Sequence, residues 1–246
     1  MDKVISRLKN ESECSGCGAC IAVCPKNAIE KRETVLGAWV PEINADLCVN
    51  CGLCEKVCKA SIWQNDLPKR AYVAYNKNQD MRKISASGGA FSALATYVLA
   101  CGGSVFGAEI YFEDGKAIVE HNKITQIKEL PRLLGSKYVQ SDAIKAYKQV
   151  RKELKSGHIV LFSGCSCQIA GLKNYLSGVD TTNLYTIDLI CHGVPSIDLL
   201  NSYIMFLEEK HNGVIRSLSF RTKEKGKIIY KLTTQIDDKS AKRRLI

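Results

Sequence analysis

The second half of the chain alternates between short apolar runs and longer amphipathic stretches. Apolar runs at residues 158–162 and 184–190 are typical of strands buried on both faces of a parallel sheet. Stretches at residues 143–155 and 197–210 place apolar positions at helical spacing. Because strand-like and helix-like segments take turns, the pattern predicts an α/β domain with a mostly parallel sheet.

Weaker signals fill in the rest of this domain. An uncharged, mostly apolar stretch at residues 90–101 predicts a helix, for which Ser87 is a suitable N-cap. Asp114-Gly115 favours a tight hairpin turn between two apolar segments. The further predicted strands are residues 72–75, 104–110, 116–121 and 214–220.

The N-terminal part follows a different pattern, because eight of the twelve cysteines fall in two runs of identical spacing, C-x2-C-x2-C-x3-C. The runs are Cys14, Cys17, Cys20 and Cys24, and then Cys48, Cys51, Cys54 and Cys58. This is the spacing of bacterial ferredoxins that carry two [4Fe–4S] clusters. Residues 37–43, between the runs, predict one strand of a small hairpin. The segment is therefore expected to be an α+β, ferredoxin-like domain.

The same spacing predicts which thiolates share a cluster. Three closely spaced cysteines surround one cube, and in two-cluster ferredoxins the fourth cysteine of each run binds the other cluster. The predicted metal ligands are Cys14, Cys17, Cys20 and Cys58 for the first cluster, and Cys48, Cys51, Cys54 and Cys24 for the second.

Zinc and disulfides explain the two runs less well. A zinc site takes four ligands, often as two CxxC pairs, and has no use for a third evenly spaced cysteine. Disulfides between such close neighbours would be strained. The two runs differ in that Pro25 follows the first and Lys59 follows the second. This difference affects local shape and cluster potential rather than ligation.

The expected domains are a two-cluster ferredoxin-type domain at residues 1–66 and an α/β domain at residues 67–246, with a subdivision near residue 155 as an option. Iron–sulfur thiolates need a reducing compartment, so a cytoplasmic location is expected, and the N-terminus lacks the apolar run of a signal peptide. Residues 84–108 are uncharged but are interrupted by Gly102 and Gly103, so no membrane span is expected.

The formal net charge is +10, and two clusters of about −2 each would lower it to about +6. A basic chain suits an acidic redox partner or an anionic cofactor. The sequence contains no nucleic-acid recognition motif, so no nucleic acid is expected as a partner.

Three loops follow predicted strands and are candidate ligand sites: residues 85–89, 163–168 and 191–196. In α/β sheets, ligands bind at the carboxyl ends of the strands. The glycines of the first loop permit close backbone approach, and the helix that follows favours phosphate. Three such loops in one domain favour a bound anionic cofactor.

Four cysteines lie outside the two runs. Cys101 ends an apolar stretch and is expected to be a small core residue. A third metal site and a redox-active pair are both open for Cys165, Cys167 and Cys191. His192 follows Cys191 and is either an acid–base group at the sheet edge or a structural histidine.

Four collinear segments carry a resemblance to a known family: residues 85–89, 135–141, 164–172 and 190–196. The chain resembles the β subunit of coenzyme F420-dependent hydrogenases and dehydrogenases, in the form with a fused two-cluster ferredoxin domain. That family usually has Thr-Pro-Cys where this chain has Cys165-Ser166-Cys167. Cys167 is thus the family position, and Cys165 is the departure from it.

The resemblance implies a flavoprotein in which FAD takes a hydride from a reduced deazaflavin and passes single electrons to iron–sulfur clusters. The implied flavin-binding residues are Ser87, Gly88, Gly89, Lys137, Gln140, Cys167 and Gln168. The catalytic candidates are Cys191 and His192. The physiological substrate, which need not be coenzyme F420, the direction of electron flow and the partner do not follow from the resemblance.

The expected function is that of an iron–sulfur flavoprotein oxidoreductase subunit, which passes electrons between a small-molecule substrate, a flavin, two [4Fe–4S] clusters and a redox partner protein. A non-enzymatic electron carrier and a cluster-binding redox sensor are the alternatives, with an α/β domain that only docks a partner. Residues after 220 show no apolar pattern that would close a domain, so the α/β domain is expected to be incomplete at its C-terminus.

Overall fold

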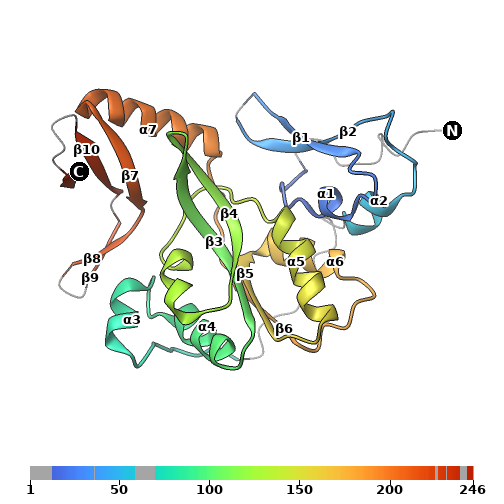
Figure 1. The fold of residues 1–246 in the computed structure, drawn as a ribbon, viewed down its shortest axis with the longest axis horizontal. Coiled ribbons are helices and arrows are strands. Elements are labelled where there is room, and N and C mark those ends of the chain that lie inside the picture. The colour runs from blue at the N-terminus through green and yellow to red at the C-terminus, as the bar shows by residue number, and fades with distance from the viewer. Residues whose placement is uncertain are drawn as a thin grey trace.

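The computed structural model describes residues 13–35, 37–58, 70–224, 227–230, 232–238 and 243–245 (Figure 1). These residues form a mixed α/β structure with a small N-terminal hairpin unit beside a larger sheet. The expected boundary between the two domains, at residues 66 and 67, lies outside the described residues.

The N-terminal unit consists of a hairpin and two short helices. β1 (Ile29–Glu33) pairs antiparallel with β2 (Trp39–Ile43), which confirms the strand expected between the cysteine runs. α1 (Ala19–Val23) follows Gly18, whose φ is 78°, and α2 (Leu53–Val57) follows its counterpart Gly52, whose φ is 72°. Glycine adopts this left-handed conformation without strain, so each run can turn sharply between its second and third cysteines.

The main sheet is mixed. Its strands, in the order β4-β3-β5-β6, are β4 (Lys116–Ile124), β3 (Ser104–Glu113), β5 (Val160–Cys165) and β6 (Leu184–Leu189). β3 and β4 form the expected hairpin, with Asp114 at φ 49° and Gly115 at φ 76° as the tight turn requires. β3, β5 and β6 run parallel. Two of the three pairings in this sheet are therefore parallel.

The helices predicted at residues 90–101, 143–155 and 197–210 are present as α4 (Ala90–Ala100), α5 (Ile144–Lys155) and α7 (Ile197–His211), and α6 (Ser166–Tyr175) follows β5. Two shorter helices were not predicted: α3 (Gln79–Ile84) and the 3-10 helix η2 (Ile127–Leu133). α3 is capped by Asn78, whose side chain accepts hydrogen bonds from the backbone N–H groups of Asp80 and Met81. Six residues are too few to display a helical repeat in the sequence.

One apolar core joins the N-terminal unit to the α/β domain. Ala19 and Cys20 of the unit are buried together with Tyr147 of α5 and Leu172 of α6. Figure 1 shows α1 and α2 directly beside α5 and α6. The cysteine loops are thus fixed against the sheet domain by packing.

Polar contacts support the same interface. Lys31 of β1 forms an ion pair with Asp142, just before α5. The side-chain amide of Asn174 in α6 donates a hydrogen bond of 3.1 Å to the carbonyl of Val57 in α2. The unit is therefore held at two further places.

The residues after 220 include further strands, although their sequence shows little apolar pattern. The strands of this region are β7 (Gly213–Ser219), β8 (Thr222–Glu224), β9 (Lys227–Ile229), β10 (Thr233–Asp238) and β11 (Arg243–Leu245). β11, β10 and β7 form an antiparallel sheet, and β8 pairs with β9. Ile215 and Ile236 are buried with Ile204 of α7 in a second core.

Three local predictions were wrong. Residues 72–75 are exposed and belong to no strand, although Tyr72 and Val73 look strand-like in sequence. β6 lies at the edge of the sheet and is half-exposed, because only β5 pairs with it. Ser87 is not the cap of α4, since Gly89 occupies that position and Ser87 itself has φ 47°.

Within the described ranges, no helix has the length and apolar character needed to cross a membrane. The uncharged stretch at residues 84–108 is divided between α4 and β3, with Gly102 and Gly103 between them.

Candidate metal centres and cofactor site

The first group of cysteines brings together residues from both runs. Burial and then the charges of Cys17, Cys58 and Cys14 raise the pKa of Cys20 to about 12. Burial also raises the pKa of Cys14 and of Cys17, and Cys58 contributes to both increases. The last cysteine of the second run therefore lies next to the first three of the first run.

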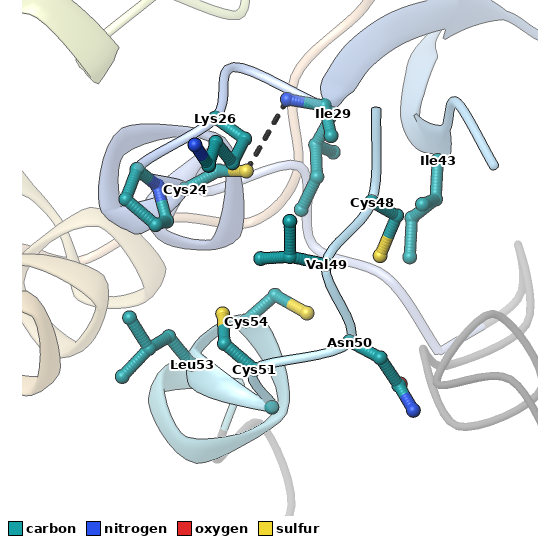
Figure 2. Close-up of a pocket in the computed structure, with 13 residues that line it drawn as sticks. Cys24, Lys26, Ile29, Ile43, Cys48, Val49, Asn50, Cys51, Leu53 and Cys54 are labelled. Atoms are coloured by element: carbon teal, nitrogen blue, oxygen red, sulfur yellow. Dashed lines mark hydrogen bonds between the residues drawn. The ribbon is translucent and has the colours of Figure 1, made fainter. Parts of the chain in front are cut away.

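In the second group, too, the fourth cysteine comes from the other run. Cys48, Cys51 and Cys54 line one pocket with Cys24, the last cysteine of the first run (Figure 2). The Cys24 thiol accepts a hydrogen bond of 3.2 Å from the backbone N–H of Ala28. Four further lining residues are apolar, Ile29, Ile43, Val49 and Leu53, and the polar side chains of Lys26 and Asn50 also line the pocket.

Four sulfur atoms in an apolar setting match what an iron–sulfur cluster needs. Burial and mutual repulsion keep free thiols protonated, as the raised pKa of Cys54 illustrates, with burial as the main cause. Iron binding removes these protons and supplies positive charge that offsets the repulsion. Among the described residues, no three His, Cys, Asp or Glu side chains could hold a single metal ion.

The two groups differ in their surroundings. Cys17 of the first group lies against α6, where a Cβ added at Gly171 would be 3.1 Å from its Sγ. In the second group Cys51 is exposed, and the nearby side chain of Val49 is 57% exposed. The first group thus faces the α/β domain, and the second has a face open to other molecules.

A basic cluster surrounds the loop at residues 85–89. The amine of Lys223 donates to the carbonyls of Ser87, at 2.8 Å, and of Arg82. Burial, and then the charges of Arg82 and Arg221, lower the pKa of Lys223. Arg221 also donates from Nη1 to Ser136 Oγ at 3.4 Å, while its buried Nε has no partner in the described part of the chain.

The loop itself is tightly packed. A Cβ added at Gly88 would lie 2.7 Å from the carbonyl oxygen of Ala74. Packing against Ala74 therefore requires glycine at this position, whether or not a ligand binds. Gly89 has φ 79°, which also favours glycine.

Gln140 and Gln168, which the resemblance also implies in flavin binding, make their hydrogen bonds to other parts of the chain. Gln140 donates from Nε2 to the carbonyl of Gly16 at 3.4 Å and thus contacts the first cysteine loop. Gln168 is buried; its Nε2 donates to Ser141 and its Oε1 accepts from the backbone N–H of Cys165 at 3.0 Å. Both side chains are engaged within the protein, and their role in flavin binding stays a prediction.

Lys137 is half-buried near the basic cluster. Its amine donates to the carbonyls of Leu134, at 2.7 Å, and Arg132, at 3.4 Å. Burial lowers the pKa of Lys137 to about 8, and the nearby carboxylate of Glu109 opposes this decrease. Ser136, the residue before Lys137, contacts Arg221.

The cysteines outside the runs occupy two different places. Cys165, Cys167 and Cys191 gather at the carboxyl ends of β5 and β6. Cys101 is exposed, so the expectation of a core residue was wrong. His192 is exposed next to Cys191.

Sequence reasoning gave no role to His121, which the structure buries beside the strand ends. Its Nε2 donates to the carbonyl of Ser163 at 2.9 Å, which leaves Nδ1 to accept from Ser141 Oγ at 3.2 Å. The ring stacks on Phe162 at 4.9 Å between centroids. Burial lowers the pKa of His121 to about 4, so the ring is neutral. The sequence signal for a buried position was its place in the strand predicted at residues 116–121, two residues after Val119.

Comparison with known proteins identifies both parts of the chain. Residues 157–244 match the family that describes the C-terminal part of the coenzyme F420 hydrogenase/dehydrogenase beta subunit, and residues 13–62 match the 4Fe-4S dicluster domain. The C-terminal part of the chain is therefore similar to the F420 hydrogenase/dehydrogenase beta subunit family, and the N-terminal part is similar to two-cluster ferredoxin domains. The family resemblance read from the sequence is thereby confirmed. This beta subunit relative carries a two-cluster 4Fe–4S domain at its N-terminal side and is an iron–sulfur redox protein.

Individual relatives match smaller parts. The chain is 40% identical over 65 residues to the A-type iron-sulfur subunit of CoB–CoM heterodisulfide reductase from Methanocaldococcus jannaschii, a match that covers 21% of this chain and 10% of that protein. It is 34% identical over 67 residues to a ferredoxin, named 7Fe, of Hydrogenibacillus schlegelii, covering 26% of this chain and 80% of that protein. The chain thus spans only a tenth of the first relative.

Among solved structures, the F420-reducing [NiFe] hydrogenase complex from Methanosarcina barkeri contains a similar chain. The identity is 16% and the TM-score 0.45, with 70% of this chain and 58% of that chain covered.

Proposed function

We propose that this beta subunit relative is the electron-transfer subunit of an iron–sulfur flavin oxidoreductase. Two [4Fe–4S] clusters carry electrons between a partner protein and a flavin in the α/β domain, where a small organic substrate reacts. The observation that carries the proposal is the exchange of the fourth cysteines: Cys58 joins the first run and Cys24 joins the second.

Each cluster has a defined position on the proposed route. The first, on Cys14, Cys17, Cys20 and Cys58, packs against α6 and is the one next to the α/β domain. The second, on Cys24, Cys48, Cys51 and Cys54, has the exposed rim and exchanges electrons with the partner. Because the chain carries a formal net charge of +10, an acidic partner surface suits this rim.

The chemistry of the basic cluster fits the anionic part of FAD. Arg82, Arg221 and Lys223 would hold the pyrophosphate beside the loop at residues 85–89, and the unpartnered Nε of Arg221 is a donor available for it. When bound, flavin supplies the conversion between two-electron chemistry on a substrate and the one-electron steps of the clusters. Coenzyme F420, named in the family's description, is one candidate substrate.

The chain's own residues contribute positioning and exclusion of water. Gln168 and Ser141 fix the start of α6 through buried hydrogen bonds, which keeps the loop after β5 rigid next to the first cluster. We keep the proposed division into two domains, at residues 1–66 and 67–246. The two domains share one packed core. Reducing conditions such as those of the cytoplasm would protect the clusters.

A carrier without enzyme activity is the second candidate. It is favoured by Gln140 and Gln168, because both amides are engaged within the protein and neither is free for a cofactor. In that case the α/β domain docks a partner, either for electron delivery or for redox sensing.

Anaerobic purification followed by iron, sulfide and flavin quantitation tests the proposal. About eight irons and about one flavin per chain are expected. About eight irons without flavin, even after incubation with FAD, would favour the carrier. About seven irons would mean that one site resembles the relative named 7Fe. Absence of iron would refute both candidates.

A further inference from the structure

Cys165, at the end of β5, lies near Cys191, which follows the end of the neighbouring parallel strand β6. Cys165 ends β5 and pairs in register with Leu189, the last residue of β6, and Cys191 follows Leu189 by two residues. The thiols of Cys165 and Cys191 are hydrogen-bond partners of each other. A sulfur atom at the end of β5 and one just after β6 thus already interact in this fold.

The backbone around the two sulfur atoms is suited to hold them. Cys165 is the N-cap of α6, and its sulfur accepts from the backbone N–H of Gln168. The sulfur of Cys191 accepts from the N–H of Gly193 at 3.4 Å. Cys165 is half-buried while Cys191 is exposed, so one sulfur is reachable from outside and the other is protected.

A third cysteine links this pair to the first cluster loop. Cys167 lies near both Cys191 and Cys17, each of which acts on it electrostatically. Cys17 in turn packs against Gly171 of the same helix that Cys165 caps. The pair is therefore close to the proposed first cluster, on the side that faces the α/β domain.

We propose that Cys165 and Cys191 form a redox-active dithiol/disulfide couple that exchanges with small organic disulfides. The inference rests on the proposed function for its source of electrons, which are the two reduced clusters. No step requires a group other than the clusters, the two thiols and the external disulfide.

The atoms and electrons balance as follows. The Cys191 thiolate attacks one sulfur of the external disulfide, forms a mixed disulfide and releases one thiol. Cys165 then attacks the Cys191 sulfur, which releases the second thiol and forms the Cys165–Cys191 disulfide. Two electrons, one from each reduced cluster, and two protons from solvent restore both thiols.

The test uses the cluster-loaded full chain under anaerobic conditions, equilibrated with graded ratios of 2-mercaptoethanol and its disulfide. Samples are quenched with acid, alkylated and digested with trypsin. The expected product is a disulfide that joins residues 156–173, which contain Cys165 and Cys167, to residues 174–210, which contain Cys191. Iron and sulfide content on the same samples reports the clusters separately.

Single variants identify the pair. The cross-linked product should persist in Cys167→Ser and in the exposed-cysteine control Cys101→Ser, and should be lost in Cys165→Ser and in Cys191→Ser. Absence of the cross-link at every ratio, with the clusters intact, would overturn the proposal. A cross-link that requires Cys167 instead of Cys165 would overturn it as well.

A second arm tests the electron supply. The oxidised chain is treated with titanium(III) citrate, and the return of free thiols at Cys165 and Cys191 is followed by alkylation. Return should be about tenfold slower in a Cys17→Ser chain whose lower iron content shows loss of one cluster. Equal rates would refute the link to the clusters, while loss of iron in the wild-type chain would refute the proposed function instead.

Discussion

The sulfur of Cys17 packs against Gly171 across the boundary between the N-terminal unit and the α/β domain. A Cβ at Gly171 would lie 3.1 Å from Cys17 Sγ and 3.1 Å from Tyr147 Oη. Glycine at this point of α6 therefore lets the first cluster loop approach the helix closely.

Gly171→Ala tests this contact. The added methyl group must push either Cys17 or Tyr147 by a few tenths of an ångström, and overpacking of this kind costs about 1–3 kcal/mol. We expect a lower melting temperature and an altered EPR signal of one cluster, with the other unchanged. Ala170→Ser, at an exposed position of the same helix, should alter neither. An unchanged EPR spectrum in Gly171→Ala would contradict the packing.

The exchange of fourth ligands predicts matching phenotypes for cysteines far apart in sequence. Cys58→Ser should resemble Cys20→Ser, and Cys24→Ser should resemble Cys54→Ser. Each should lose about four of about eight irons, because one cube loses a ligand while the other remains. Iron analysis and EPR of the reduced chains make the comparison, with Cys101→Ser as the control. If Cys58→Ser instead matched Cys54→Ser, each run would bind its own cluster.

Arg221 is the residue on which the proposed flavin site can be tested most cleanly. Arg221→Met removes the donor with the unpartnered Nε while keeping an apolar stem over Tyr230, whose ring lies 4.5 Å from the guanidinium. Loss of charge-assisted hydrogen bonds should weaken FAD binding about tenfold to a hundredfold. Fluorescence titration of flavin-free chain measures this.

Arg216→Met is the matched control for Arg221→Met, because Arg216 is exposed on β7 and pairs with Asp237. Equal flavin affinity in both variants would move the site away from the basic cluster. Gly88→Val is less informative, since the collision with Ala74 would disturb the loop whether or not flavin binds there.

His121 gives the fold a pH dependence. Burial lowers its folded-state pKa to about 4 from an ordinary value of 6.5, so between these values the unfolded chain binds a proton that the folded chain does not. The free energy of unfolding is therefore highest above about pH 6.5 and decreases as the pH drops below that value. At about pH 5.5 the decrease that is due to His121 is about 1.4 kcal/mol. His121→Gln should lose this share of the pH dependence. Denaturant unfolding at about pH 7.5 and pH 5.5 would show it, and identical pH slopes in both chains would disprove the assignment.

The cysteine spacing and the Asp114-Gly115 turn were sufficient to predict local structure because both act over a few residues. The two runs required two equivalent loops, and the turn required two residues with positive φ. The position of Cys58 beside Cys20 followed from the same pattern.

Features that depend on tertiary neighbours were not predictable in this way. The exposure of β6 follows from its place at the sheet edge, and the apolar composition of residues 184–190 does not reveal that place. Cys101 is exposed because it follows the last turn of α4. Gln140 and Arg221 acquire their surroundings from segments distant in sequence, Gly16 and Ser136.

The common core of Ala19, Cys20, Tyr147 and Leu172 holds the N-terminal unit fixed against the α/β domain. The unit therefore does not move as a flexibly linked carrier domain. Its first metal site stays at a constant distance from the strand ends of the sheet, so in the proposed function internal electron transfer would need no docking step. The outer metal site, beside the exposed Cys51, would be the one that meets a partner by diffusion. Two cluster cysteines, Cys20 and Cys54, belong to this common core, so removal of iron is expected to loosen the packing of the sheet domain as well.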